Sequence, residues 1–180
     1  MLKAHLRYEQ FSGQLGAEVT LECLHRGPAS AMLPYDPQRD EVLLVKQFRI
    51  GAYMERQRAE EGWTLEVPAG ICSAGDDPRQ TAQREMLEET GYAPLALEPI
   101  MEYLISPGFT SERIFLYLAL VDLQRPEQAG GGLDHENEDI ALIRVDFTTA
   151  MAMVSDGRIN SATPILALQW LAQNRHRLRG

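Results

Sequence analysis

The sequence has little cysteine, no long apolar run and no apolar stretch at its start. Its two cysteines, Cys23 and Cys72, are too few for a disulfide framework and lack the Cys or His spacing of a zinc site. No run approaches the ~20 apolar residues that span a bilayer, and the first residues lack a signal-peptide core. We therefore expect a protein of the reducing cytoplasm with no membrane partner.

Basic residues are also fewer than acidic ones, which limits the kinds of partner that the chain can bind. There are 17 Lys and Arg against 26 Asp and Glu, for a net charge of −9. Proteins that bind nucleic acids need clustered Lys and Arg to neutralise phosphates, so we expect no nucleic-acid partner. An anionic substrate would need the help of a metal ion. The length of 180 residues and the 44% hydrophobic content favour one globular domain over residues 1–180.

Hydrophobic periodicity predicts a chain of mixed α/β class. The predicted strands are residues 19–23, 41–49, 63–67, 100–105, 113–121 and 139–145. The predicted helices are residues 78–90, 149–155 and 164–177. We also expect a turn at 34–37, a surface loop without chemical function at 54–62, and a long mobile acidic loop at 124–139.

The helix over residues 78–90 is the best delimited of these elements. Asp77 can cap its first turn, Pro78 suits its first position, and Gly91 suits a left-handed residue at its end. The preceding strand stops at Pro68-Ala69-Gly70, a sequence that turns the chain just before the helix.

Glu85, Glu88 and Glu89 lie three and four residues apart on this helix, and therefore on one face. Such a face is most often simply solvated, and Arg84 partly neutralises it here. Hard cations such as Mg²⁺, however, prefer carboxylate and carbonyl oxygens, and the turn at Ala69 could aim carbonyls at the same place. We favour a divalent-metal site facing a solvated cleft.

Residues 70–92, GICSAGDDPRQTAQREMLEETGY, resemble the signature of the Nudix hydrolases. That signature is a glycine, five residues, a glutamate, seven residues and then Arg-Glu-U-x-Glu-Glu-x-Gly-U, where U is bulky and apolar. Every fixed position matches except Asp76, which stands in place of a glutamate and receives no catalytic role. The resemblance implies an α/β/α Nudix sandwich with a mixed sheet, preceded here by N-terminal β-strands. It also implies hydrolysis of a nucleoside diphosphate linked to another group.

The resemblance further implies Mg²⁺, with Mn²⁺ as a substitute, bound by Glu85, Glu89 and the backbone carbonyl of Ala69. Glu88 would be a neighbouring ligand or catalytic support. Metal ions that bridge pyrophosphate oxygens neutralise charge and lower the pKa of a bound water. Arg84 would orient the carboxylates, because one guanidinium can hold two of them.

Over nearly its whole length the chain also looks like the bacterial ADP-ribose pyrophosphatase branch. Pro107, sixteen residues after Gly91, stands where a proline marks that branch. Further similar stretches occur in the same order at residues 11–14, 40–49, 132–140 and 167–171. The resemblance implies ADP-ribose as substrate and a homodimer, with about residues 1–35 used in dimerisation and 36–180 forming the Nudix core.

Within that resemblance, Glu136 carries the water-activating role and Glu138 reaches another metal ion when the acidic loop closes. Arg26 and Arg49 are candidates for the anionic and adenine-bearing parts of the substrate, because guanidinium pairs with phosphate and stacks on bases. The other candidates are Phe11 for stacking on adenine, and Glu66, Ser106 and Glu112 for ribose or for positioning the metals. Each has a plain structural alternative, such as a core aromatic for Phe11 or a surface ion pair for Arg26.

Two alternative functions stay open. One is hydrolysis of GDP-mannose or another nucleoside-diphosphate sugar, since that branch shares the Ser-Pro-Gly element around Pro107. The other is a Nudix module that binds ADP-ribose without hydrolysing it. The intact Glu85, Glu88 and Glu89 argue against the second.

Overall fold

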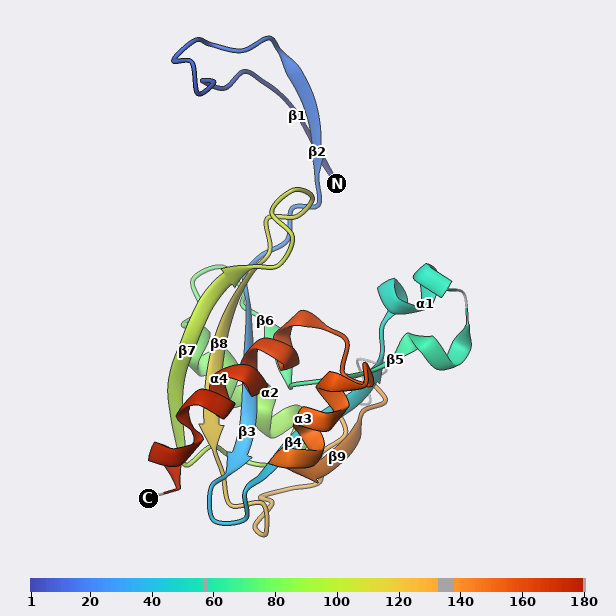
Figure 1. Cartoon of the computed structure of the whole chain (residues 1–180), viewed down its shortest axis with the longest axis vertical. Coiled ribbons are helices and arrows are strands. Elements are labelled where there is room, and N and C mark those ends of the chain that lie inside the picture. The colour runs from blue at the N-terminus through green and yellow to red at the C-terminus, as the bar shows by residue number, and fades with distance from the viewer. Residues whose placement is uncertain (57, 133–137, 180) are drawn as a thin grey trace.

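The computed structural model describes residues 1–56, 58–132 and 138–179, which form a mixed sheet, a separate hairpin and helices (Figure 1). The strands are β1 (Leu2–Leu6), β2 (Val19–Cys23), β3 (Ala29–Asp36), β4 (Glu41–Phe48), β5 (Trp63–Glu66), β6 (Ala69–Ile71), β7 (Ala96–Leu104), β8 (Arg113–Leu120) and β9 (Ala141–Asp146). The helices are α1 (Ile50–Arg56), the 3₁₀ helix η1 (Ala59–Gly62), α2 (Pro78–Thr90), α3 (Phe147–Ser155) and α4 (Ala162–Leu178). In this described part, no helix is long and apolar enough to cross a membrane.

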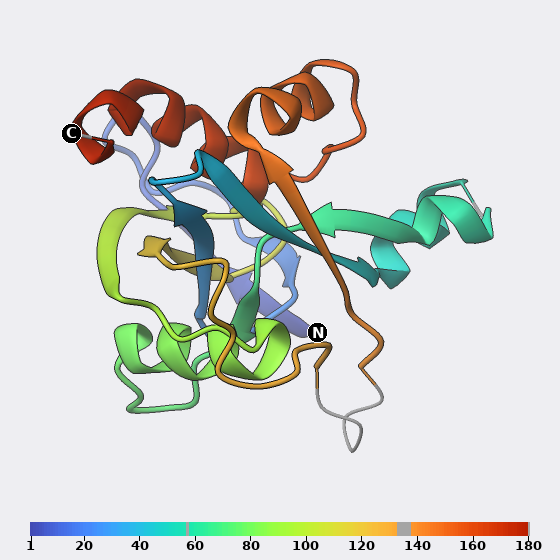
Figure 2. The same ribbon diagram turned by 90° about the horizontal axis from the view of Figure 1, so that it is seen from below.

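The seven-stranded sheet is mixed, as predicted. Its central path is β5-β4-β3-β8-β7, with β6 paired to β3 and β9 paired to β4. Strands β3 and β8 run parallel, and the other pairs are antiparallel. One core, built with α3 and α4, lies on one face, and a second core, built with α2, lies on the other. Figure 2 shows these helices on opposite sides of the sheet, which confirms the α/β/α sandwich.

Helix α2 has the predicted bounds because its end signals are local. Asp77 accepts a hydrogen bond from the backbone N–H of Arg79 at 2.9 Å, which caps the first turn. At the other end Gly91 has a φ of 76°, a left-handed conformation that glycine adopts without strain.

The turn predicted at residues 34–37 is wrong, because β3 continues through Pro34 to Asp36 and the turn follows at 37–40. A proline within a run argues against a central strand, since it cannot donate to the ladder. Here β6 pairs with residues 29–31 of β3, and β4 pairs with β3 only from Tyr35 onward. Pro34 therefore lies between these two antiparallel partners, and neither pairing needs its N–H.

The surface loop predicted at residues 54–62 is also wrong, since α1 and η1 form a helical excursion there. The Phe48 ring organises it by packing against Tyr53 and Trp63, with ring centroids 5.8 and 5.9 Å apart. A methyl group at Gly62 would overlap the Phe48 ring, so glycine here allows the ring to lie in this position. Composition alone did not indicate such long-range packing.

Strand β7 begins at Ala96 rather than at the predicted residue 100. The register of its pairing with β8 shifts between Pro99 and Met101, where Pro99 interrupts the alternation that a sequence pattern relies on. Among the described residues, the N-terminal β1 and β2 pair only with each other, and they project away from the sheet (Figure 1).

Candidate active site

A cleft of about 610 Å³ opens beside the segment that joins β5 to β6. Among the residues that line it are five predicted from the sequence, namely Arg26, Arg49, Glu66, Ala69 and Glu112. They come from separate parts of the chain: Arg26 precedes β3, Arg49 follows β4, Glu66 ends β5, Ala69 begins β6 and Glu112 precedes β8.

Glu89 is buried next to Ala69, with only 2% of its surface exposed, and is not among the residues that line the cleft. The backbone N–H of Ala69 donates a hydrogen bond to its Oε2 at 3.2 Å. Burial, helped by the charges of the nearby Glu85 and Glu138, raises the pKa of Glu89 to about 8, and the hydrogen bond from Ala69 opposes this rise. The expectation that Glu89 faces a solvated cleft is therefore wrong, since α2 presses this side chain under β6.

Arg84 holds the other two signature carboxylates. Its Nη2 donates to Glu85 Oε1 at 2.5 Å and its Nη1 donates to Glu88 Oε2 at 2.6 Å. The predicted orienting role of Arg84 is matched by this fork. Burial raises the pKa of Glu85, and the charge of Arg84 opposes that rise.

Gly70 makes room for Glu85. A methyl group at Gly70 would overlap the Glu85 carboxyl group, so the first glycine of the signature lets this carboxyl lie directly against β6. Asp76 has a local task, because its Oδ2 accepts a hydrogen bond from the Ser73 N–H at 2.8 Å and closes the turn before α2. This contact explains why the shorter side chain is accommodated.

The donor set fits a hard cation in its chemistry. Glu85, Glu88, Glu89 and Glu138 supply carboxylate oxygens, and Glu138 lies close enough to Glu85 and Glu89 to raise the pKa of both. Within residues 1–56, 58–132 and 138–179, however, no three acidic, Cys or His side chains converge on one metal position. The reason is visible in the contacts, since Arg84 occupies Glu85 and Glu88 while Ala69 occupies Glu89. A cation would need these side chains to turn toward a common point.

Two ion pairs lie among the residues that line the cleft. Arg49 donates through Nε and Nη2 to Glu66 Oε2 at 2.9 and 2.8 Å, and Thr64 Oγ1 donates to Glu66 Oε1 at 2.9 Å. Arg26 lies 3.7 Å from Glu112, measured from Nε to Oε1. Both arginines therefore pair with a carboxylate at the cleft, and their side chains remain partly exposed, so an anion can reach them.

The described residues that line this cleft do not include Phe11 or Ser106, nor the carboxylates of Glu85, Glu88, Glu89 and Glu138. Phe11 is fully exposed on the turn between β1 and β2. Ser106 lies in the turn after β7, where its carbonyl accepts from Phe109 and Thr110, and its neighbour Ile105 lines the cleft instead. Glu136 lies outside the described residues, so its predicted role stays a prediction.

Two residues at the site were missed from the sequence. Thr64 positions Glu66, and its place two residues earlier on the same strand face is the signal that could have found it. Ser161 lines both this cleft and an adjoining one of about 470 Å³, and its buried Oγ has no hydrogen-bond partner in the described part of the chain. Helix α4 begins at Ala162 rather than the predicted residue 164, which hid the role of Ser161 at its N-terminus.

Comparison with known proteins decides the family of this fold and site. Residues 25–160 match the model of the NUDIX domain. The chain belongs to the Nudix family. The resemblance found in residues 70–92 is thus confirmed, and this Nudix chain carries its signature on the turn before α2 and on α2 itself.

Named relatives of this Nudix chain cover most of its length. It is 39% identical over 175 residues to the ADP-ribose pyrophosphatase of Escherichia coli, which covers 96% of this chain and 81% of that protein. It is 37% identical over 174 residues to the ADP-ribose pyrophosphatase of Haemophilus influenzae, covering 96% and 79%. A GDP-mannose pyrophosphatase of Pectobacterium atrosepticum is 36% identical over 150 residues, covering 82% and 74%.

A solved structure shares the fold. The crystal structure of an ADP compounds hydrolase superposes with a TM-score of 0.73, covering 99% of this chain and 88% of that chain at 19% identity. At that identity the likeness establishes the arrangement of strands and helices, which agrees with the predicted sandwich.

Proposed function

We propose that this protein hydrolyses ADP-ribose to AMP and ribose 5-phosphate with the help of Mg²⁺, for which Mn²⁺ can substitute. The observation that carries the proposal is that Ala69, which lines one cleft with Arg49 and Arg26, donates its backbone N–H to the signature carboxylate of Glu89. The whole-length similarity to ADP-ribose pyrophosphatases supports this substrate over other diphosphates.

The carboxylates of Glu85, Glu88 and Glu89, with the carbonyl of Ala69, would hold the cation. When bound, the cation supplies neutralisation of the pyrophosphate charge and a coordinated water of lowered pKa. Arg84 keeps Glu85 and Glu88 side by side and limits their mutual repulsion. Removing one member of this set would leave the others misplaced.

The reaction itself is a substitution at phosphorus. The oxygen of a water molecule forms a bond to one phosphorus atom, and the bridging P–O bond between the two phosphates breaks. We assign acceptance of the water proton to Glu136 and support of the carboxylate cluster to Glu138 and Glu88. The fixed guanidinium of Arg49 would bind the diphosphate oxygens, because Glu66 and Thr64 hold it in place before substrate arrives.

The remaining assignments concern the two ends of the substrate. We assign Arg26 to the adenine-bearing part, with Glu112 fixing its guanidinium. Ser106 and Glu112 are assigned to ribose hydroxyls, and Phe11 to stacking on adenine. Because Phe11 lies on the projecting hairpin, that last role requires the hairpin of a second copy of the chain.

Purified protein with Mg²⁺ is expected to convert ADP-ribose to AMP and ribose 5-phosphate, and excess chelator should abolish the reaction. Product analysis by chromatography checks both parts. Full activity in chelator would contradict the metal requirement. Because a GDP-mannose pyrophosphatase is also among the relatives, GDP-mannose and other nucleoside-diphosphate sugars form the comparison panel. A higher kcat/KM for GDP-mannose would favour that substrate. Tight binding of ADP-ribose without turnover would favour a Nudix module that binds ADP-ribose without hydrolysing it.

The chain is expected to be a homodimer of about twice 20.2 kDa in solution. The hairpin exposes five large apolar side chains, Leu2, Tyr8, Phe11, Leu15 and Leu21, which a second copy would cover. Light scattering at micromolar concentration gives the mass. Phe11→Ala should raise KM for ADP-ribose by roughly tenfold, the loss of one stacking contact of about 1–1.5 kcal/mol, with a smaller effect on kcat. A fully active monomer would contradict both expectations.

A further inference from the structure

The segment between β8 and the acidic residues is fastened to the C-terminal end of α2. The backbone N–H groups of Glu127 and Gln128 donate to the carbonyl of Gly91 at 2.8 and 3.2 Å, and Gln128 Nε2 donates to the carbonyl of Leu87 at 3.1 Å. The N–H of Gly131 donates to the carbonyl of Glu89 at 2.8 Å. The bond from Gly131 satisfies the carbonyl of Glu89, one of those that a helix end otherwise leaves without an intrahelical partner. We call residues 127–132 the anchor segment.

Two glycines allow the anchor segment to approach the helix so closely. A methyl group at Gly130 would overlap the backbone carbonyl group of Thr90, and one at Gly91 would overlap the carbonyl oxygen of Gln128. Because backbone lies against backbone, neither clash could be relieved by rotating a flexible side chain. The last glycine of the Nudix signature thus serves as the docking surface for this segment as well as the end of α2.

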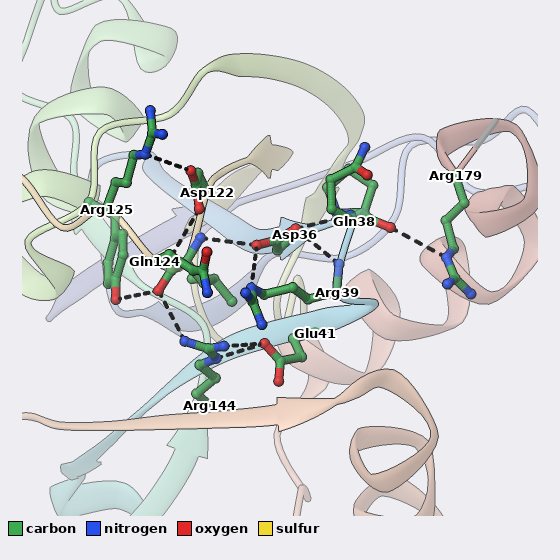
Figure 3. Close-up of polar contacts among 12 residues, drawn as sticks. Asp36, Gln38, Arg39, Glu41, Asp122, Gln124, Arg125, Arg144 and Arg179 are labelled. Atoms are coloured by element: carbon green, nitrogen blue, oxygen red, sulfur yellow. Dashed lines mark hydrogen bonds and ion pairs between the residues drawn. The ribbon is translucent and has the colours of Figure 1, made fainter.

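The chain is also held where it leaves the sheet, before it reaches the anchor segment. The N–H of Leu123 donates to Asp36 Oδ2 at 3.1 Å, and its carbonyl accepts from Arg144 Nη1 at 3.0 Å and from the Tyr92 hydroxyl at 3.1 Å. Figure 3 shows Asp36 and Arg144 approaching this point from β3 and β9. Asp36 is only 2% exposed, so the start of the segment has a fixed place on the core.

The other end of the anchor segment meets Glu138. The N–H of Ile140 donates to the carbonyl of Gly131 at 3.2 Å, which brings the chain back beside the segment. A methyl group at Gly132 would lie 2.6 Å from Glu138 Cβ, so Glu138 rests directly against Gly132. Gly131 therefore donates its N–H to the backbone of Glu89 and accepts, through its carbonyl, from the backbone of Ile140, the residue just before β9. The distance between Glu138 and Glu89 depends on these few contacts.

We propose that the anchor segment is a positioning element of the active site, in which Gly130 and Gln128 act by setting Glu138 against Glu89 and Glu85. The kinetic test of this role rests on the proposed function, because it measures hydrolysis of ADP-ribose. The metal-binding test needs only the carboxylate cluster. It assigns a role to residues that touch neither substrate nor the reacting atoms.

Gly130→Ala tests the proposal most directly, since the added methyl group must push the anchor segment off α2. A displacement of about 1 Å can lower kcat by up to about 10²-fold, and we expect a loss approaching that size. The Mg²⁺ requirement should rise severalfold, while KM for ADP-ribose should change by less than about threefold. Thermal unfolding confirms that the variant is folded. Wild-type kcat and Mg²⁺ dependence in a folded Gly130→Ala would overturn the proposal.

Gln128→Ala offers a milder variant that keeps the test valid if Gly130→Ala does not fold. It removes one hydrogen bond to Leu87, and because that bond helps to hold the anchor segment on α2 we expect kcat to fall by up to roughly fivefold. Gln124→Ala is the matched control, because Gln124 is an exposed glutamine in the same connection between β8 and β9. The substitution leaves the hydrogen bond from its backbone N–H to Asp122 in place. Equal kinetics for the two variants would contradict the role of Gln128.

A double variant separates positioning from general destabilisation. If Gly130 acts through Glu138, then Gly130→Ala combined with Glu138→Gln should be no slower than Glu138→Gln alone, whereas independent effects multiply. Titration with Mn²⁺ alone, followed by electron paramagnetic resonance, gives a readout that needs no substrate. If the parent protein fails to hydrolyse ADP-ribose, the proposed function fails, and the Mn²⁺ titration still decides this inference. Multiplying losses, or equal Mn²⁺ affinity in parent and Gly130→Ala, would overturn it.

Discussion

Glu89→Gln is expected to abolish hydrolysis and at the same time to stabilise the metal-free protein at alkaline pH. Activity should be lost because a neutral amide is a poor ligand for a hard cation. Stability should rise because Glu89 is only 2% exposed and its carboxylate is pressed against β6 near Glu85 and Glu138. A glutamine of the same shape removes the buried charge and can accept the same hydrogen bond from Ala69.

The pH range of this stabilisation follows from the pKa of Glu89. Burial raises that pKa from an ordinary value of 4.5 to about 8, so between these values the folded protein binds a proton that the unfolded chain has released. The free energy of unfolding of the parent therefore falls as pH rises from about 4.5 to about 8. The Glu89→Gln variant does not lose stability over this pH range. Its stability advantage over the parent is therefore absent below about pH 4.5 and complete above about pH 8. At about 1.4 kcal/mol per pKa unit, the gain is on the order of a few kcal/mol.

Thermal unfolding in chelator at about pH 4.5 and about pH 9 measures this effect for parent and Glu89→Gln. Glu85→Gln serves as the comparison, since it should also lose activity, and Arg84 opposes the rise in the pKa of Glu85. If Glu89→Gln keeps more than about a tenth of parental turnover, Glu89 is not a central metal ligand. Such a loss of activity would be smaller than the loss expected from removing even one general base. Parallel stability profiles for parent and variant would contradict the buried charge.

The sequence predicts those parts of the site that depend on local spacing. The bounds of α2 follow from Asp77 and Gly91, and the fork of Arg84 follows from carboxylates one and four residues away on one helix. Both depend on contacts within a single turn or two of the chain. For the same reason the signature could be identified before the sheet was known.

The rest of the site depends on contacts between distant elements. The burial of Glu89 under Ala69 joins residues twenty apart, and the buried strand β3 passes through Pro34, whose missing N–H matters only once its neighbours are known. Composition made residues 54–62 look like a plain loop, whereas the structure has the end of α1 and the whole of η1 in this region, between Tyr53 and Trp63, which both pack on Phe48. Glu66 could be predicted as a strand-end carboxylate, but its pairing with Arg49 could not.

Glu136→Gln is expected to lower kcat by roughly 10² to 10⁴, equivalent to about 3 to 5 kcal/mol, with little change in substrate or metal affinity. This follows from the proposal that Glu136 accepts the proton of the attacking water, because an amide of the same shape cannot do so. Steady-state kinetics across a range of Mg²⁺ concentrations gives the measurement. The loss should persist at saturating Mg²⁺, since proton acceptance does not depend on metal occupancy.

Glu138→Gln is the matched comparison, because Glu138 lies beside Gly132 and raises the pKa of both Glu85 and Glu89. A carboxylate at that place should assist cation binding, so its removal should raise the Mg²⁺ requirement and be partly rescued by more Mg²⁺. If Glu136→Gln instead runs near the parental rate while Glu138→Gln is inactive, the two roles are reversed. If both variants are active, the proton acceptor must be sought among Glu66, Glu88 and Glu112. In that case the acidic loop is a solvated connection, and the chemistry belongs to the cleft and α2 alone.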